Sequence, residues 1–221
     1  MKILYFYFAL LLLVGCTSVF RPYPCGPILD KTQIQIFKKQ SDYLNLQPGT
    51  VFADIGASSG YHDGAMAVFL DSVTFYLNDI DHHCLNKKNL TKVLRYYSKL
   101  KGRSIEETND FHYVIGTPKR TNLPLATFDV IFTNATLHVL DYPDSILSDV
   151  YKNLKTDGSF YIRDEIVENG IIKSCSSKKC GHQLLQHQQL MDLTARNGFE
   201  LTGESHAFGH PIYKFSKKHK P

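Results

Sequence analysis

The stretch Val51-Phe-Ala-Asp54-Ile-Gly56-Ala-Ser58-Ser-Gly60 decides the fold of this chain. Its apolar first half is typical of a buried strand, and its small residues then form a turn that leads into a helix over residues 62–70. Small residues let the backbone approach a ligand closely, and the unpaired N–H groups at the start of the helix can bind polar or anionic groups. The stretch therefore predicts a strand, a turn and a helix built around a ligand.

A second strand is predicted over residues 73–79, and it ends in the carboxylate of Asp79. This acid lies nineteen positions beyond Gly60, about where nucleotide-binding folds place the acid that binds a ribose. Turn, helix, strand and acid in this order favour a nucleoside-type cofactor site over a merely structural tight turn.

The rest of the chain also alternates between helical and strand patterns. Helices are predicted over residues 28–46, 82–101, 141–154 and 183–196, and strands over residues 111–115, 128–133, 159–167, 199–205 and 211–215. The last two strands have no helix between them, so they can pair antiparallel at one edge. The predicted fold is α/β: a Rossmann-like, seven-stranded, mostly parallel sheet with helices on both faces and an antiparallel edge strand.

Composition and charge restrict the partners of the protein. A hydrophobic content of 43% in 221 residues is enough for the core of one ordinary α/β domain. The net charge of +4 is modest, and the basic residues cluster in residues 87–101 and 214–220. A solvated helix face and a frayed terminus account for these clusters, so we expect no nucleic-acid partner.

The N-terminus has the pattern of an export signal. An unbroken apolar run over residues 3–14 is too short to span a bilayer comfortably. The sequence Leu13-Val-Gly-Cys16 resembles a bacterial lipobox, whose cysteine is lipidated; an ordinary cleaved signal and a buried core helix are the alternatives. Thr17 follows Cys16 at the position where a signal for retention in the inner membrane usually has Asp. The resemblance therefore implies a protein of the cell envelope that is lipid-anchored through Cys16 in the outer membrane and faces the periplasm. The expected organisation is a signal peptide (1–15), a lipidated tether (16–27), one domain (28–217) and a tail (218–221).

Export would place the cysteines in an oxidising compartment. Cys175 and Cys180 are close enough in sequence to form a disulfide across a short loop. A metal site is the alternative, because these cysteines and His182 supply three ligands and His187 could add a fourth. The irregular spacing favours the disulfide, so no metal is predicted. Cys84 is expected to be a small buried hydrophobic residue on a helix.

Four motifs together resemble those of a class I S-adenosylmethionine-dependent methyltransferase. They are Asp54-Ile-Gly56-Ala-Ser58-Ser-Gly60, Asn78-Asp79-Ile-Asp81, Leu123-Pro-Leu-Ala-Thr-Phe-Asp129-Val-Ile-Phe-Thr-Asn134 and Leu154-Lys-Thr-Asp-Gly158-Ser-Phe. The resemblance covers residues 28–217, and the order and spacing of the motifs are specific for the fold but much less so for a substrate. It implies S-adenosylmethionine as the cofactor.

The resemblance also implies roles for residues of the first motif. Gly56, Ser58 and Gly60 would line the methionine portion of the cofactor, with Asp54 at the head of the loop. The family usually has glycine where Ser58 stands, and serine narrows the loop. The structural alternative for Asp54 is a cap of the following turn.

The adenosine portion would be bound by residues after the second and third strands. Asp79 would accept hydrogen bonds from both ribose hydroxyls, although it could instead cap the next helix. Ile80 would pack against the adenine. Thr117 stands where the family often has an acid that meets the adenine amine, so it is the residue expected to contact the base there.

Methyl transfer from a sulfonium is an in-line displacement that depends mainly on positioning. By the resemblance, Asn134 would face the transferring methyl group from the carboxyl end of its strand. A general base is needed only if the acceptor is a protonated hydroxyl or amine. His138, one helical turn beyond Asn134, is the best candidate for this base; Asp164, Glu165 and His62 are alternatives.

Three functions are compatible with these patterns. The first is a membrane-anchored methyltransferase that acts on a small-molecule, lipid-like or peptide acceptor, of which the small molecule is favoured. The second is an exported binding module that keeps the methyltransferase fold without catalysis, because S-adenosylmethionine is a cytoplasmic metabolite. The third, a nicotinamide dehydrogenase, is disfavoured because the turn lacks the longer glycine spacing of that family.

Overall fold

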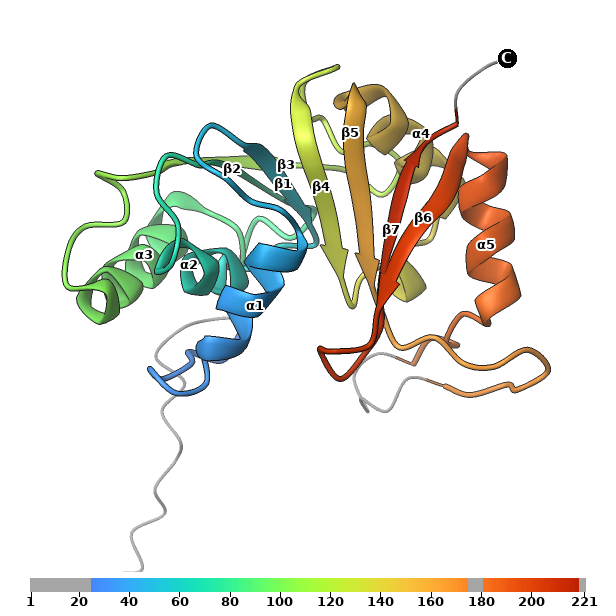
Figure 1. The fold of residues 1–221 in the computed structure, drawn as a ribbon, viewed down its shortest axis with the longest axis horizontal. Coiled ribbons are helices and arrows are strands. Elements are labelled where there is room, and N and C mark those ends of the chain that lie inside the picture. Colours follow the sequence, from blue (N-terminus) through green and yellow to red (C-terminus); the bar gives the residue numbers. More distant parts are fainter. Residues whose placement is uncertain (1–24, 175–180, 219–221) are drawn as a thin grey trace, which may run out of the picture.

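A computed structural model describes residues 25–174 and 181–218 of the protein (Figure 1). Its centre is a seven-stranded sheet with the order β3-β2-β1-β4-β5-β7-β6. The first five strands run parallel, and β7 is antiparallel to both of its neighbours, β5 and β6. The predicted fold class is therefore confirmed. The strands are β1 (Val51–Ile55), β2 (Thr74–Asp79), β3 (Asp110–Ile115), β4 (Phe128–Asn134), β5 (Leu154–Arg163), β6 (Phe199–Ser205) and β7 (Ile212–Lys217).

Helices cover both faces of the sheet. α1, α2 and α3 pack on one face, and α4 and α5 pack on the other (Figure 1). A short 3-10 helix, η1, follows β4 at the carboxyl ends of the parallel strands. The bounds are α1 (Gln35–Tyr43), α2 (Tyr61–Ala67), α3 (Lys87–Lys101), η1 (Leu137–Val139), α4 (Pro143–Asn153) and α5 (His187–Arg196).

Side chains of the central strands alternate between two hydrophobic cores. Phe52 of β1 belongs to the core beneath α1 to α3, whereas its neighbour Ala53 belongs to the core beneath α4 and α5. Strand β4 repeats the pattern, because Val130 and Phe132 enter the first core and Ile131 enters the second. Both faces are thus buried, which explains the nearly continuous apolar runs of these strands.

Several elements differ from their predicted bounds. α3 begins at Lys87 rather than at residue 82, because the Asn86 side chain caps it by accepting a hydrogen bond from the N–H of Asn89 at 3.0 Å. β5 begins earlier than predicted, at Leu154, since its first residue already pairs with Phe128 ahead of a bulge. The predicted helices over residues 28–46, 62–70, 141–154 and 183–196 are all shorter in the structure.

Some predictions concern residues that the structure does not describe. The export signal, the lipidation site Cys16 and the disulfide between Cys175 and Cys180 lie outside the described residues. Within residues 25–174 and 181–218, no helix has both the length and the apolar character needed to cross a membrane.

Candidate cofactor site

The carboxyl ends of β1 and β2 open onto a cavity of about 220 Å³. From β1 the chain adds β2 and then β3 on one side of β1, and it then crosses to β4 on the other side. The strand order therefore reverses at β1, and such a reversal leaves the crevice in which parallel α/β sheets bind ligands. Four residues predicted to bind the cofactor line this cavity: Gly56, Asp79, Ile80 and Thr117. Its remaining walls come from the loop after β3, from the segment around η1 and from Ile146 of α4.

Asp79 is held in place by two backbone N–H groups. The N–H of Ser58 donates to Asp79 Oδ2 at 2.7 Å, and the N–H of Asp81 donates to Asp79 Oδ1 at 2.9 Å. A carboxylate offers about four acceptor positions, so each oxygen can still accept a further hydrogen bond. Because Asn86 caps α3, Asp79 does not serve as its cap. The acid is positioned to accept two hydroxyl groups from the cavity.

The two glycines of the turn have different structural roles. Gly56 (φ 84°) lines the cavity, and a Cβ on it would overlap the side chain of Thr136. Gly60 (φ 80°) begins α2, and a Cβ there would overlap Leu77 of β2 and Leu90 of α3. Gly60 therefore serves the packing of a helix against the sheet, whereas Gly56 lies at the ligand cavity.

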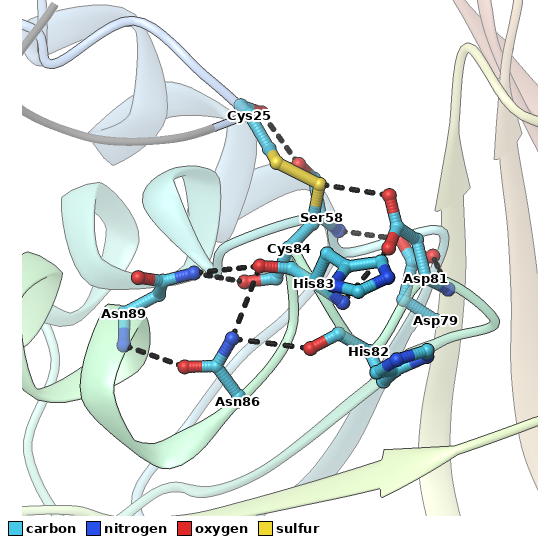
Figure 2. The surroundings of a disulfide bond; sticks show 9 residues. All are labelled: Cys25, Ser58, Asp79, Asp81, His82, His83, Cys84, Asn86 and Asn89. Carbon is cyan, nitrogen blue, oxygen red and sulfur yellow. Dashed lines mark hydrogen bonds between the residues drawn. A yellow bond between two sulfur atoms is a disulfide. The ribbon is translucent and has the colours of Figure 1, made fainter.

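Ser58 adopts a left-handed conformation that usually favours glycine. Its φ is 53°, and its Oγ donates a hydrogen bond to the carbonyl oxygen of Cys25 at 2.5 Å. The backbone N–H of Ser58 also donates to the Asp79 carboxylate, so Ser58 links Cys25 to the acid that lines the cavity. Figure 2 shows Ser58 between these two partners.

Two buried carboxyl groups lie next to the turn. Asp54 at the end of β1 and Asp63 on α2 are 2% and 0% exposed. One oxygen of Asp54 and both oxygens of Asp63 have no hydrogen-bond partner among the described residues. Burial raises the pKa of Asp63 to about 7. Burial, together with repulsion from Asp63 and Asp79, raises the pKa of Asp54 well above its usual range. Near neutral pH the pair therefore retains a proton, which a cationic group nearby would displace.

Asn134 belongs to a hydrogen-bonded cluster with His62 and Arg163. Asn134 Nδ2 lies 2.8 Å from His62 Nδ1, and Asn134 Oδ1 accepts a hydrogen bond from Arg163 at 2.9 Å. Arg163 also donates to the carbonyl oxygen of Phe208 at 2.8 Å. Burial, and secondarily the charge of Arg163, lower the pKa of His62 to about 3, so His62 is neutral and accepts from the amide. Both ends of the Asn134 amide are thus bound by protein groups.

His138 lies on η1 and is paired with Asp164, which follows β5. His138 Nδ1 is 2.7 Å from Asp164 Oδ1, and the backbone N–H of His138 donates to Asp164 Oδ2 at 3.2 Å. When Nδ1 donates, the neutral imidazole has its basic lone pair on Nε2. This is the arrangement of a base oriented by a carboxylate. Thr136 and Val139, on either side of His138, line the cavity.

The other candidate bases have different environments. His62, with its low pKa, accepts a hydrogen bond from the Asn134 amide. Glu165 forms an ion pair with Lys173 at 2.6 Å, and this hydrogen bond holds the pKa of Glu165 below its usual range. Asp164 is the partner of His138. The pair of His138 and Asp164 is therefore the best-supported base.

Cys25 and Cys84 form a disulfide that the sequence did not indicate (Figure 2). The expectation for Cys84 was wrong: it is half-buried in the turn between β2 and α3, rather than buried on a helix. The two cysteines are 59 positions apart, and only the fold brings them together. Asp81 lies close to both sulfur atoms, but sulfurs joined in a disulfide are not thiolate ligands, so this cluster is not a metal site.

The residues around the cavity fit an adenosyl group. Asp79 has acceptor capacity for two hydroxyls, and the Ile80 side chain, 57% exposed, offers an apolar surface for a base. Asp54 and Asp63 are buried and do not line the cavity. The cavity is smaller than a typical drug-sized site, so it can enclose only part of S-adenosylmethionine.

Comparison with known families supports this description. The model of the methyltransferase domain family matches residues 53–162, which include the last three residues of β1, the glycine turn, Asp79 and β4. This match and the fold described above support a methyltransferase domain of the class I S-adenosylmethionine-dependent type, and the cofactor that they indicate is S-adenosylmethionine, as predicted. Comparison with curated protein sequences finds no match.

Solved structures share the fold at low sequence identity. A SAM-dependent methyltransferase from Aquifex aeolicus is 13% identical, with 84% of this chain and 92% of that chain covered and a TM-score of 0.60. The 1,6-didemethyltoxoflavin-N1-methyltransferase of Burkholderia thailandensis, with bound 1,6-didemethyltoxoflavin and S-adenosylhomocysteine, is 16% identical, covers 85% and 80%, and has a TM-score of 0.59. The cyclase SpnF is 14% identical, covers 84% and 81%, and has a TM-score of 0.62.

Sequence reasoning missed three features of the site. Asp63 gave no signal, because an acid in the first turn of a helix is usually a solvated dipole partner. Arg163 is the last residue of β5, and the sequence alone does not show which side chains of this strand face the site. The disulfide of Cys25 and Cys84 depends on a contact between distant segments.

Proposed function

We propose that the protein is an S-adenosylmethionine-dependent methyltransferase that acts on a small-molecule acceptor. The observation that carries this proposal is Asp79, which lines the cavity and is bound by the N–H of Ser58 in the glycine turn. The methyltransferase of Burkholderia thailandensis, whose structure holds 1,6-didemethyltoxoflavin, shares the fold and motivates the choice of acceptor class.

Each part of the cofactor has residues that would hold it. Asp79 would bind the ribose hydroxyls, and Ile80 and Thr117 would contact the adenine. Asp54 and Asp63 would offset the positive charge of the methionine end. When bound, the cofactor supplies an activated methyl group on a positively charged sulfur.

The protein itself must position the acceptor and, for some acceptors, remove a proton. Alignment of nucleophile and methyl group supplies most of the rate acceleration in such a displacement. For a hydroxyl or amine acceptor, His138 Nε2 would take the proton while Asp164 stabilises the resulting imidazolium. The buried Asp164 carboxylate fixes the orientation of the ring for this step.

A transfer assay tests this function. The full chain is incubated with methyl-labelled S-adenosylmethionine and a small-molecule extract, and the label in the extract is measured. Asp79→Ala should reduce transfer roughly 100-fold, because two hydrogen bonds to a charged group are lost. His138→Gln should reduce it by about 10²-fold or more for an acceptor that needs a base. The exposed Glu107→Ala is the control and should transfer as the wild type does.

The alternative is a cofactor-binding module without catalysis. It is favoured by Asn134, whose amide is bound on both sides by His62 and Arg163. Wild-type protein that binds S-adenosylhomocysteine but transfers no label to any fraction would contradict the methyltransferase and support this module.

We also propose that the protein is exported and anchored through Cys16. The disulfide of Cys25 and Cys84 supports this location, because such bonds persist mainly in oxidising compartments. An enzyme outside the cytoplasm would need S-adenosylmethionine delivered to it, so its location and its activity are linked.

A further inference from the structure

An N-terminal strap, residues 25–34, crosses the surface beside the glycine turn and is held at three points. Cys25 is joined to Cys84 by the disulfide, and its carbonyl oxygen accepts the hydrogen bond from Ser58 Oγ. Further along the strap, Leu29 exchanges hydrogen bonds with two tyrosines of α3: its N–H donates to Tyr97 at 3.4 Å, and its carbonyl oxygen accepts from Tyr96 at 3.3 Å. Ile34, at its end, is buried in the core.

The other end of the disulfide, Cys84, lies in the turn that follows Asp79, the residue proposed to bind the ribose. Cys84 follows Asp79 by five positions, and the carbonyl oxygen of Cys84 accepts a hydrogen bond from Asn89 of α3 at 3.0 Å. Asn86 Nδ2 donates to the carbonyl oxygens of His82 and His83, both at 3.1 Å. Figure 2 shows these bonds around the disulfide. Side-chain hydrogen bonds and the disulfide thus hold this turn together.

Ser58 is the point at which the strap meets the cofactor cavity. A serine with a positive φ is strained relative to glycine, which adopts this backbone conformation freely. Its hydroxyl binds the strap at Cys25, and its N–H binds Asp79. A strained residue whose side chain and backbone contact two different segments favours a role in positioning rather than a neutral replacement of glycine.

We infer that the Cys25–Cys84 disulfide positions the glycine turn and Asp79 for cofactor binding, so that affinity for the cofactor depends on the redox state of this bond. The inference rests on the proposed function. A dithiol reductant opens the disulfide: it gives up two electrons and two protons, forms its own cyclic disulfide, and leaves thiols on Cys25 and Cys84. The strap then loses its covalent attachment, and Ser58 and the turn of residues 79–84 gain freedom that binding must restrict again.

The test uses the full chain with Cys16, Cys175 and Cys180 replaced by serine, so that Cys25 and Cys84 are its only thiols. Binding of S-adenosylhomocysteine is measured by calorimetry before and after dithiothreitol, at a temperature where circular dichroism shows both forms folded. Free-thiol titration establishes that the bond has opened. We expect reduction to weaken binding about tenfold, which corresponds to the ordering cost of one or two immobilised side chains.

Two variants separate positioning from a purely structural role. A chain that also carries Cys25→Ser and Cys84→Ser should bind like the reduced protein with or without dithiothreitol. Ser58→Gly removes the hydroxyl contact to Cys25 and should make the affinity less sensitive to reduction, without loss of the fold.

The outcomes are distinct. A lower melting temperature with unchanged affinity after reduction would show that the disulfide only stabilises the fold, and the inference would be wrong. Tighter binding after reduction would make the strap an obstacle and would also overturn it. Absence of binding by both folded forms would instead refute the proposed function, and this inference with it.

Discussion

At the residue scale, the feature that sets this site apart is the pair of buried carboxyl groups, Asp54 and Asp63. A buried carboxylate without a hydrogen-bond partner is costly, and the protein avoids that cost by keeping a proton on the pair. The sequence pointed to Asp54 because it begins the motif. It did not point to Asp63, because whether an acid on a helix is buried depends on what packs over it.

The pair predicts a specific dependence of stability on pH. The folded-state pKa of Asp63, about 7, is above its unfolded value of 3.8, so the folded protein binds more protons between these values. Its contribution to stability is therefore present at low pH and is lost as the pH rises towards 7. Asp63→Asn removes this contribution. The melting temperature of Asp63→Asn minus that of wild type should therefore be about 5 °C larger at pH 8 than at pH 5.5.

The control for this measurement is Asp110→Asn, which changes an exposed acid at the start of β3. Its melting temperature relative to wild type should be the same at both pH values. If the difference between Asp63→Asn and wild type were also independent of pH, Asp63 would be ionised in the folded protein, and the proton-sharing pair would be wrong.

At the scale of elements, the sequence predicted what local periodicity determines. The apolar runs of β1 and β4 and their order were predictable because both faces of these strands are buried. The start of α3 was not, because the Asn86 cap decides it and the preceding residues have the same helical pattern. The path of the strap was also inaccessible, since Leu29 is bound by tyrosines more than sixty positions away.

The turn between β1 and α2 gives a prediction at this scale. Gly60→Ala places a methyl group against Leu77 and Leu90 in addition to straining a positive φ. We expect a loss of roughly 2–5 kcal/mol in the free energy of unfolding, measured by urea denaturation. Gly49→Ala is the matched control, because Gly49 also has a positive φ (91°) but nothing lies near its Cβ position.

Gly49→Ala should lose only about 1–2 kcal/mol, the cost of the backbone conformation alone. Equal losses in the two variants would mean that Gly60 is required only for its φ. In that case the close packing of α2 and α3 against β2 would not be what selects glycine at this position.

At the scale of the whole molecule, the domain combines a cytoplasmic type of cofactor site with a disulfide typical of exported proteins. The sheet order, with β7 between β5 and β6, was predictable only in part, because a missing helix indicates antiparallel pairing but not which strand lies at the edge. The family was recognisable from four motifs, whereas the acceptor depends on loop geometry that no motif records.

We predict that the whole protein carries a lipid attached at Cys16. Cells expressing the full chain are labelled with radioactive palmitate, and the label in the purified protein is measured. Wild-type protein should incorporate label, and Cys16→Ala should not. Cys175→Ser is the control for labelling at another cysteine and should incorporate as much as wild type. Equal incorporation by wild type and Cys16→Ala would contradict the anchor.

The central claim, an adenosyl site at the carboxyl ends of β1 and β2, is tested most directly by calorimetric titration of the oxidised full chain with S-adenosylhomocysteine. We predict one site with a Kd in the micromolar range, about −8 kcal/mol, and affinity reduced roughly 100-fold in Asp79→Ala but unchanged in Glu107→Ala. Absence of binding by folded wild-type protein, or equal affinity in wild type and Asp79→Ala, would contradict it.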